Sequence, residues 1–269
     1  MNRGSLRGSP IEAEFEVLLS GLDGWAAGIT TDPSGEGRSG SADFGLSTGG
    51  SAWDVSERYL ALAHRLDFGA AAVARQVHGV ALVDSRQAPD GGLWIAGDAD
   101  GFVGPAMPGR LFCVTVADCV PVYLLTPEGA AFALLHAGWR GAAGGILPVA
   151  IERLCRAEGV ESTDLRVHLG PAICAECYVV GQEVPDGFDL SPADREAVVR
   201  PVDPADSAGS VRFDLRGALA CQARLAGVDL SKITVSASCT RCGAADGLFS
   251  HRGGGDSAGR MIAWLGRRT

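Results

Sequence analysis

Residues 111–141 read LFCVTVADCVPVYLLTPEGAAFALLHAGWRG, in which three apolar runs are separated by short segments that contain Asp, Pro or Gly. The three runs cover residues 111–116, 121–125 and 130–135, and a fourth run of the same kind covers residues 71–77. Short apolar runs that end at Gly, Pro or Asp are typical of buried β-strands. We therefore predict that these four runs are strands of a buried sheet.

Helical spacing of apolar residues appears on both sides of this region. Asp54 can cap a helix that carries Val55, Tyr59, Leu62 and Leu66 on one face. Residues 214–226 have an Asp cap, apolar residues at helical spacing and Gly227 as terminator. Further helices are predicted over residues 141–157 and 192–199, and further strands over residues 166–169, 233–237 and 261–265. The mixture predicts an α/β or α+β fold, a single layered domain with a mixed β-sheet flanked by helices.

Composition limits the class of protein. The chain has 269 residues, 46% of them apolar, and its net charge of −9 comes without any run of five like charges. This balance argues against nucleic acid or an anionic membrane as the main partner. The N-terminus has no apolar signal-like segment, and no window approaches the roughly 18 apolar residues of a membrane span. We therefore expect a cytoplasmic protein with no membrane partner.

Three reactive side chains stand at or just beyond predicted strand ends: His78 in QVHG, Cys119 in ADCVPV and His136 in HAGWRG. Residues at strand ends face a shared cleft, so the three can converge. Two imidazoles and one thiolate suit a catalytic Zn²⁺ site, which takes three protein ligands and leaves one position for water or substrate. The alternative is that Cys119 is a small buried hydrophobe and that each His is an ordinary surface or core residue.

Copper is a weaker alternative for the same residues. A multicopper oxidase needs about ten imidazoles, many in His-x-His pairs. This chain has five His and no such pair. A single blue-copper centre needs two His, one Cys and a weak axial ligand, for which Met107 is available.

The segments QVHG, ADCVPV, LHAGWRG and GPAI, the Cys239-Thr240 pair, and the later FSHR and GRM segments occur in the order and approximate spacing of the laccase-domain family. The chain resembles that family from about Trp25 onward. Residues 1–24 are accordingly expected to be an N-terminal segment, partly disordered, and residues 25–269 to form the domain. The family was named for polyphenol oxidase and comprises zinc-containing purine nucleoside phosphorylases with adenosine deaminase activity. The resemblance implies that His78, Cys119 and His136 are zinc ligands.

The resemblance also implies that Arg58, on the helix before the first ligand, belongs to the active site. Arg140, His251 and Arg252 stand in segments that the family retains, which favours substrate-binding roles. Asp118, beside Cys119, is the candidate proton shuttle. The chain departs from the family pattern near its N-terminus, where an Arg and an Asn are replaced in the Gly-rich stretch of residues 30–50, and after Cys177, where the usual acidic residue is absent. We expect the Gly-rich stretch to be a long, mobile loop.

The function implied by the resemblance is phosphorolysis of purine nucleosides such as adenosine, inosine and methylthioadenosine with inorganic phosphate, together with deamination of adenosine. Arg58 would hold phosphate through two parallel hydrogen bonds. One alternative is a cysteine hydrolase that edits a peptidoglycan precursor, with Cys119 as nucleophile and a His as base. Another is a catalytically degenerate metal-binding protein.

Two Cys-x-x-Cys pairs, Cys174 with Cys177 and Cys239 with Cys242, form a second candidate metal site. The spacing within each pair suits a closed structural zinc site. However, 61 residues separate the pairs, far more than in compact zinc ribbons. The other interpretation is that these are buried or locally paired thiols.

Overall fold

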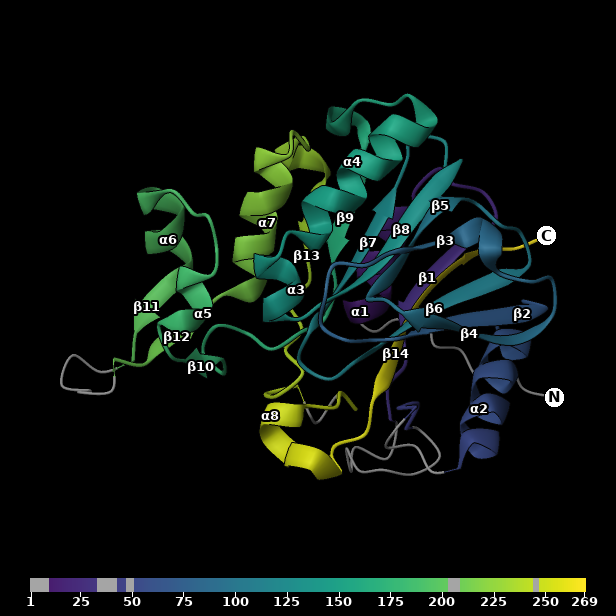
Figure 1. Ribbon diagram of the computed structural model, residues 1–269, viewed down its shortest axis with the longest axis horizontal. Helices are drawn as coiled ribbons and strands as arrows, with labels where there is room; N and C mark the ends of the chain where they lie inside the picture. Colours follow the sequence, from purple (N-terminus) through teal and green to yellow (C-terminus); the bar gives the residue numbers. More distant parts are fainter. Residues whose placement is uncertain (1–9, 33–42, 47–50, 203–208, 244–246) are drawn as a thin grey trace.

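The apolar runs of the sequence become neighbouring strands in two large sheets, each of which packs helices against its outer face (Figure 1). The computed structural model describes residues 10–32, 43–46, 51–202, 209–243 and 247–269. The predicted α/β class, a single layered domain with helices around mixed strands, is confirmed. The prediction of one mixed sheet is refined, because the described strands form two large mixed sheets and one small sheet.

The first large sheet has six strands in the order β13-β9-β7-β8-β5-β3. Its strands are β3 (Val83–Asp84), β5 (Gly101–Pro105), β7 (Val120–Leu125), β8 (Ala131–Ala137), β9 (Arg166–Leu169) and β13 (Ile233–Val235). The central strands β9, β7, β8 and β5 pair antiparallel, whereas β13 runs parallel to β9. The ends of β9 and β13 therefore lie at the same edge of the sheet.

The second large sheet has five strands in the order β1-β14-β6-β2-β4. Its strands are β1 (Trp25–Ile29), β2 (Ala70–Arg75), β4 (Gly92–Asp98), β6 (Arg110–Val116) and β14 (Met261–Arg267). β2 runs parallel to both β4 and β6, and β14 pairs antiparallel with β1 and β6.

Successive side chains along a strand point to opposite faces of its sheet, and this alternation explains how the layers pack. On β6, Phe112 and Val114 point into the core between the two sheets, whereas Leu111 and Cys113 point to the opposite face. Phe112 meets Phe132 of β8 across the layer, with ring centroids 4.7 Å apart. Because both faces of these strands are buried, their sequence is apolar almost without interruption.

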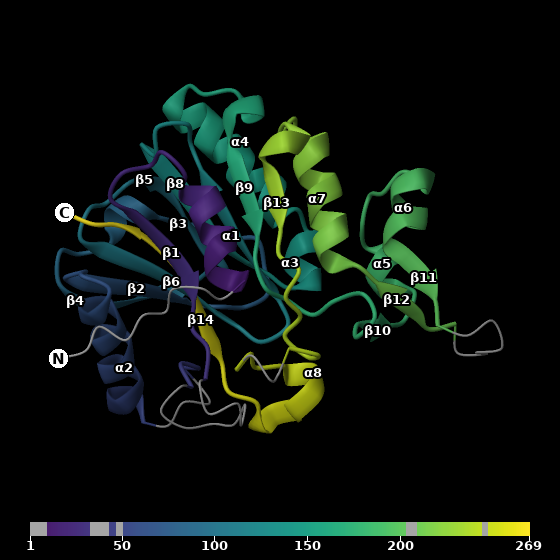
Figure 2. The same ribbon diagram turned by 180° about the vertical axis from the view of Figure 1, so that it is seen from behind.

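Helices cover the outer faces, α2 (Ala52–Arg65) on the five-stranded sheet and α4 (Ile146–Glu158) with α7 (Leu215–Leu225) on the six-stranded sheet. Figure 2 shows α2 on the side of the molecule away from α4 and α7. A small antiparallel sheet of β10 (Val179–Val180), β11 (Val199–Pro201) and β12 (Val211–Phe213) projects beyond α7, with α5 (Glu183–Asp186) and α6 (Pro192–Val198) beside it.

Two helix predictions need correction. The cap of α2 is Ser51 rather than Asp54: the Ser51 hydroxyl accepts the backbone N–H of Asp54 at 3.2 Å, and the helix begins at Ala52. The single helix predicted over residues 141–157 is two helices, α3 (Trp139–Ala143) and α4. Gly145 separates them with a φ of +85°, a left-handed conformation that cannot continue a helix.

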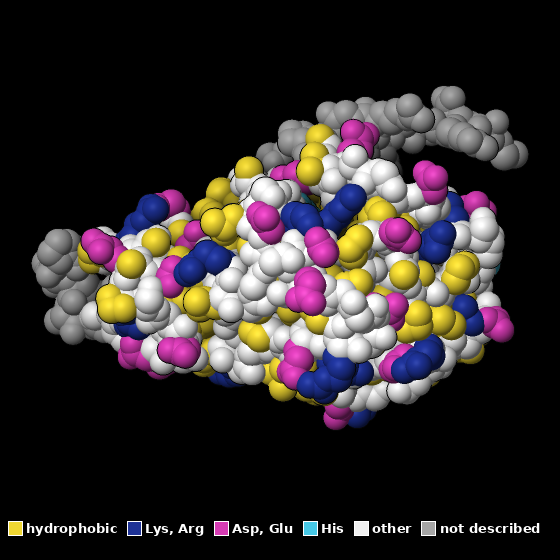
Figure 3. Space-filling view, turned by 90° about the horizontal axis from the view of Figure 1, so that it is seen from above, with side chains coloured by type: hydrophobic (Ala, Val, Ile, Leu, Met, Phe, Trp, Pro, Cys, Tyr) yellow, Lys and Arg dark blue, Asp and Glu magenta, His cyan; other side chains and the backbone are white. Residues whose placement is uncertain are grey.

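The N-terminal segment includes a helix, α1 (Pro10–Leu19), whose Phe15 and Leu18 are buried in the core between the sheets. Residues 1–9 lie outside the described residues, as do residues 33–42 and 47–50 of the Gly-rich stretch, where a mobile loop was predicted. In the part of the chain that the structure describes, no helix is long and apolar enough to cross a membrane. On the face seen in Figure 3, basic and acidic side chains lie interspersed.

Candidate active site and metal centre

The structure brings His78, Cys119 and His136 together. One ligand atom from each lies within 4.8 Å of the others, and their exposure is graded, with His136 buried, Cys119 half-buried and His78 exposed. The rings of His78 and His136 meet edge to face, with centroids 4.8 Å apart. A cluster of three candidate ligands that is exposed on one side suits a metal site with a fourth position left for water or substrate.

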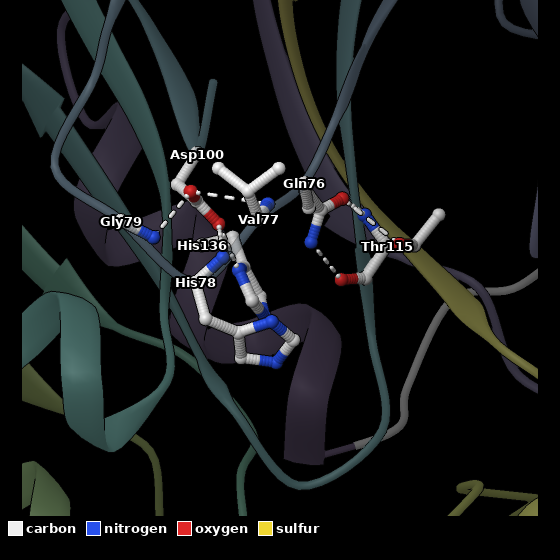
Figure 4. Close-up of polar contacts among 7 residues, drawn as sticks. All are labelled: Gln76, Val77, His78, Gly79, Asp100, Thr115 and His136. Carbon is white, nitrogen blue, oxygen red and sulfur yellow. Dashed lines mark hydrogen bonds and ion pairs between the residues drawn. The ribbon is translucent and has the colours of Figure 1, made fainter. Parts of the chain in front are cut away.

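His78 stands in a turn just beyond β2, as predicted, and its φ of 59° is left-handed. The buried carboxylate of Asp100 stabilises this turn by accepting the backbone N–H groups of Val77, His78 and Gly79 at 3.3, 2.9 and 2.6 Å (Figure 4). Backbone hydrogen bonds of this kind fix the direction in which the His78 ring leaves the chain.

The same carboxylate orients His136. Asp100 Oδ1 lies 2.9 Å from His136 Nδ1, and the backbone N–H of His136 donates to the Asp100 carbonyl at 2.7 Å. A carboxylate on Nδ1 leaves Nε2 as the nitrogen for a metal. Burial raises the pKa of Asp100, but hydrogen bonds from His136 and Gly79 bring that pKa below its ordinary value. Sequence reasoning missed Asp100, which lies between β4 and β5, two strands that the sequence analysis did not predict.

Gln76 ties the His78 turn to β6. Its side-chain oxygen accepts the backbone N–H and the hydroxyl of Thr115 at 2.7 and 2.8 Å, and its amide donates to the Thr115 carbonyl at 2.8 Å. Thr115 lies near the end of β6, just before the turn that holds Cys119. The Gln76 side chain, drawn in Figure 4, thus connects the segment of His78 with the segment that leads to Cys119.

Cys119 lies in the turn between β6 and β7, and His136 lies inside β8, one residue before its end. Burial raises the pKa of the Cys119 thiol, but His136 and His78 beside it more than offset this and lower the pKa to about 6. Burial lowers the pKa of His136, whereas Cys119 and Asp100 raise it to about 9. The site therefore favours a thiolate, the form of Cys that binds a metal.

Two glycines of the HAGWRG segment make room for the cluster. A Cβ atom on Gly138 would lie 3.0 Å from Cys119 Sγ and 3.0 Å from His78 Cδ2. A Cβ atom on Gly141 would lie 2.7 Å from the carbonyl oxygen of Gly79. Close approach of the third ligand's segment to the other two thus requires glycine at these positions.

Asp118 is held in place through both carboxylate oxygens. Oδ1 accepts the Thr240 hydroxyl and Oδ2 accepts the backbone N–H of Arg252, both at 2.6 Å. The φ of Asp118 is 89°, so its backbone is strained and needs this support.

The three predicted substrate-binding residues, Arg140, His251 and Arg252, contact nearby backbone carbonyls or aromatic rings. The guanidinium of Arg252, on α8 (His251–Gly254), donates to the Val179 carbonyl at 2.6 Å and stacks on the Tyr178 ring. Exposed Arg140 lies over the ring of Trp139, and exposed His251 contacts the Gly255 carbonyl through Nδ1.

Tyr178, which sequence reasoning did not select, lies under the guanidinium of Arg252. Burial raises its pKa to about 12, with a further rise from Cys119 and Asp118 that Arg252 and Arg140 oppose.

Arg58 is half-buried on α2 and donates through Nη1 to the Asp43 carbonyl at 2.5 Å. Asp43 lies in the Gly-rich stretch of residues 30–50, where the chain departs from the family pattern.

The comparisons with known proteins cover nearly the whole chain. The family model described as multi-copper polyphenol oxidoreductase laccase matches residues 27–268. The chain belongs to this laccase-domain family. A curated relative from Geobacillus stearothermophilus, named purine nucleoside phosphorylase YlmD, is 35% identical over 254 residues, which are 91% of each chain. A relative named adenosine deaminase RL5, from an unknown prokaryotic organism, is 32% identical over 96% of this chain and all of its own.

The fold of this chain is also similar to solved structures, in agreement with the family assignment from the sequence. The crystal structure of YlmD from Geobacillus stearothermophilus has a TM-score of 0.77 and 32% identity, with 93% of this chain and 94% of that chain covered. The family name points to copper. However, Met107, the residue available as an axial ligand in the blue-copper alternative, packs against the core before β6, whereas Cys119 follows β6. β6 has seven residues, so its two ends, beyond which Met107 and Cys119 lie, are roughly 20 Å apart.

Proposed function

We propose that this protein is a zinc-dependent purine nucleoside phosphorylase that also deaminates adenosine. The observation that carries the proposal is the convergence of His78, Cys119 and His136 on one open site, with Asp100 orienting two of them. The names of the relatives supply the substrate class. A zinc ion held by these three residues would supply a Lewis acid with one position left for water or substrate.

The residues of the chain divide the remaining work. In phosphorolysis, a phosphate oxygen forms a bond to C1′ of the ribose while the C1′–N9 bond breaks and its electron pair leaves with the purine. Arg58 is our candidate for holding the phosphate in line, because a guanidinium donates two parallel hydrogen bonds to an oxyanion. Arg140, His251 and Arg252 are the candidates for binding the nucleoside. Asp118 is the candidate proton shuttle in deamination, and hydrogen bonds from Thr240 and Arg252 hold its carboxylate in place.

The test is to incubate the purified protein with inosine or adenosine, with and without phosphate, and to identify the products by chromatography. Free base and ribose 1-phosphate should appear only with phosphate, and inosine should form from adenosine in either condition. Cys119→Ser and His136→Ala should lose both activities together with one zinc, while Cys155→Ser, outside the cluster, should keep both. If the protein binds zinc but catalyses neither phosphorolysis nor deamination, the alternative of a catalytically degenerate metal-binding protein is favoured.

One observation favours a second candidate, a cysteine hydrolase acting on an acyl substrate such as a peptidoglycan precursor. Cys119, His136 and Asp100 stand in the order of a nucleophile, a base and the carboxylate that orients the base. Metal content separates the two functions, because a thiolate bound to zinc is not available as a nucleophile. Rapid alkylation of Cys119 in the protein as purified, with hydrolytic activity unaffected by chelators, would favour the hydrolase.

A further inference from the structure

The two Cys-x-x-Cys pairs, 61 residues apart in the sequence, meet at one edge of the six-stranded sheet. Cys174 and Cys177 lie in the turn after β9, and Cys239 and Cys242 lie in the turn after β13. Since β9 and β13 are parallel neighbours, both turns leave the sheet at the same edge. An isolated parallel bridge between Ala172 and Cys239 continues the alignment beyond the strands. The separation along the chain is therefore no obstacle to a shared site.

The distances between the sulfur atoms suit a metal. All four Sγ atoms lie within 4.8 Å of one another, and Cys174 Sγ lies 3.8 Å from Cys242 Sγ. In a tetrahedral site with Zn–S bonds of about 2.3 Å, the edge between two sulfurs is about 3.8 Å. A disulfide needs a separation of about 2.05 Å.

Hydrogen bonds to sulfur support the same interpretation. Cys239 Sγ accepts the backbone N–H of Cys242 at 3.5 Å, within its own turn, and the backbone N–H of Cys174 at 3.3 Å, from the other turn. Backbone donors that point at a sulfur stabilise the thiolate, which is the form that binds a metal. The second of these bonds also links the two pairs directly.

We propose that Cys174, Cys177, Cys239 and Cys242 form a closed structural Zn²⁺ site, separate from the His78, Cys119 and His136 cluster. Zinc would replace the four thiol protons, which are released to solvent, and all four coordination positions would be filled by protein. This site does not depend on the proposed function, because it has no position left for water or substrate.

Zinc bound by the four cysteines would also hold Asp118 in place beside the candidate active site. Both turns also contact Asp118, the neighbour of Cys119: the backbone N–H of Ile173 donates to the Asp118 carbonyl at 3.1 Å, and the Thr240 hydroxyl donates to its carboxylate at 2.6 Å. Arg241 adds a bond to the Cys177 carbonyl at 3.2 Å. A metal that fastens the two turns to each other therefore also supports the strained backbone of Asp118.

The test is zinc stoichiometry in the full chain, purified under reducing conditions and measured by elemental analysis. We expect about two zinc ions per chain, about one in His78→Ala, about one in the Cys174→Ser/Cys242→Ser double variant, and none when the three changes are combined. The matched control is Cys155→Ser/Cys221→Ser, which removes two partly buried cysteines outside both clusters and should keep about two. The Cys174→Ser/Cys242→Ser variant should also have a lower melting temperature than this control.

X-ray absorption at the zinc edge tests the proposal in the unmodified protein, in case a variant fails to fold. Averaged over both sites, each zinc should have about 2.5 sulfur neighbours, whereas zinc at the His78, Cys119 and His136 site alone would have about one. One zinc per chain with about one sulfur neighbour would overturn the proposal. So would iron in place of zinc, or disulfides between the pairs in the intact mass.

Discussion

Asp100 Oδ1 lies 2.9 Å from Nδ1 of His136, and the Asp100 side chain is fully buried. The same carboxylate accepts the backbone N–H of His78, so one buried anion orients two of the three candidate ligands. This arrangement makes Asp100 a positioning residue for the candidate metal ligands.

Asp100→Asn should weaken zinc binding at the His78, Cys119 and His136 site by roughly 10- to 100-fold, the usual cost of losing a carboxylate that orients a ligand. Asparagine is similar in size, but it loses the negative charge and turns N–H groups toward backbone donors. Zinc affinity is measured by competition with a chelator. Asp98→Asn, two residues away on an exposed side chain that pairs with Arg75, is the matched control and should bind zinc normally. Equal affinities in the two variants would contradict the role of Asp100.

Gly138→Ala should also weaken zinc binding although it removes no ligand. The backbone of Gly138, with φ −70° and ψ 165°, is open to alanine, so any effect comes from the new methyl group against Cys119 and His78. Gly97→Ala, where nothing lies within 4 Å of the added atom, is the control. Zinc retained after dialysis against a chelator is the measurement, and full retention in Gly138→Ala would show that the cluster yields to the methyl group.

Arg58→Ala should cost phosphorolysis about 2 to 4 kcal/mol of transition-state stabilisation, a range typical of one lost preorganised donor. Deamination uses no phosphate and should fall much less, with zinc content unchanged. Arg65→Ala, at the exposed end of the same helix, is the control. Equal losses in both reactions would indicate that Arg58 acts only by holding the Asp43 segment.

Arg58→Lys asks whether charge alone is enough to hold phosphate. Lysine keeps the positive charge but loses the paired donors, so phosphorolysis should remain well below that of the unmodified protein. Full recovery of the phosphorolysis rate would show that a point charge suffices.

His168 should make the fold sensitive to acid. Burial lowers its pKa from 6.5 to about 4. Between these values the unfolded state binds a proton that the folded state does not, so the free energy of unfolding rises with pH in this window and falls on acidification. By pH 4.5 the loss from this group should be about 2 to 3 kcal/mol. Glu14 Oε2, 3.8 Å from His168 Nε2, is too far for a hydrogen bond that would offset burial.

The measurement is the urea midpoint of unfolding at pH 7 and pH 4.5. His168→Phe keeps a ring beside Phe15 and Tyr123 and should lose less stability on acidification than the unmodified protein. His64→Gln, on an exposed position of α2, should leave the acid sensitivity unchanged. Identical acid sensitivity in His168→Phe and the unmodified protein would contradict the prediction.

The amino-acid sequence alone predicted most of the local structure correctly. The runs over residues 111–116 and 121–125 are strands β6 and β7, and the helix predicted around Leu219 is α7, because the spacing of apolar side chains reports which faces of an element are buried. It was less reliable at element ends, as Ser51 and Gly145 show. Caps and left-handed turns depend on single residues, and both Ser51 and Asp54 are residue types that cap helices.

How these elements meet in space could not be predicted from the sequence. The division of the strands into two sheets, the buried carboxylate of Asp100 beneath His136, and the meeting of Cys174 with Cys242 all join residues that are far apart in the chain. Local patterns record how side chains alternate along one element, but they do not record which strand lies beside which. Here the parallel pairing of β9 with β13 sets the path of the backbone, and that path brings the two cysteine pairs to the same edge of the sheet.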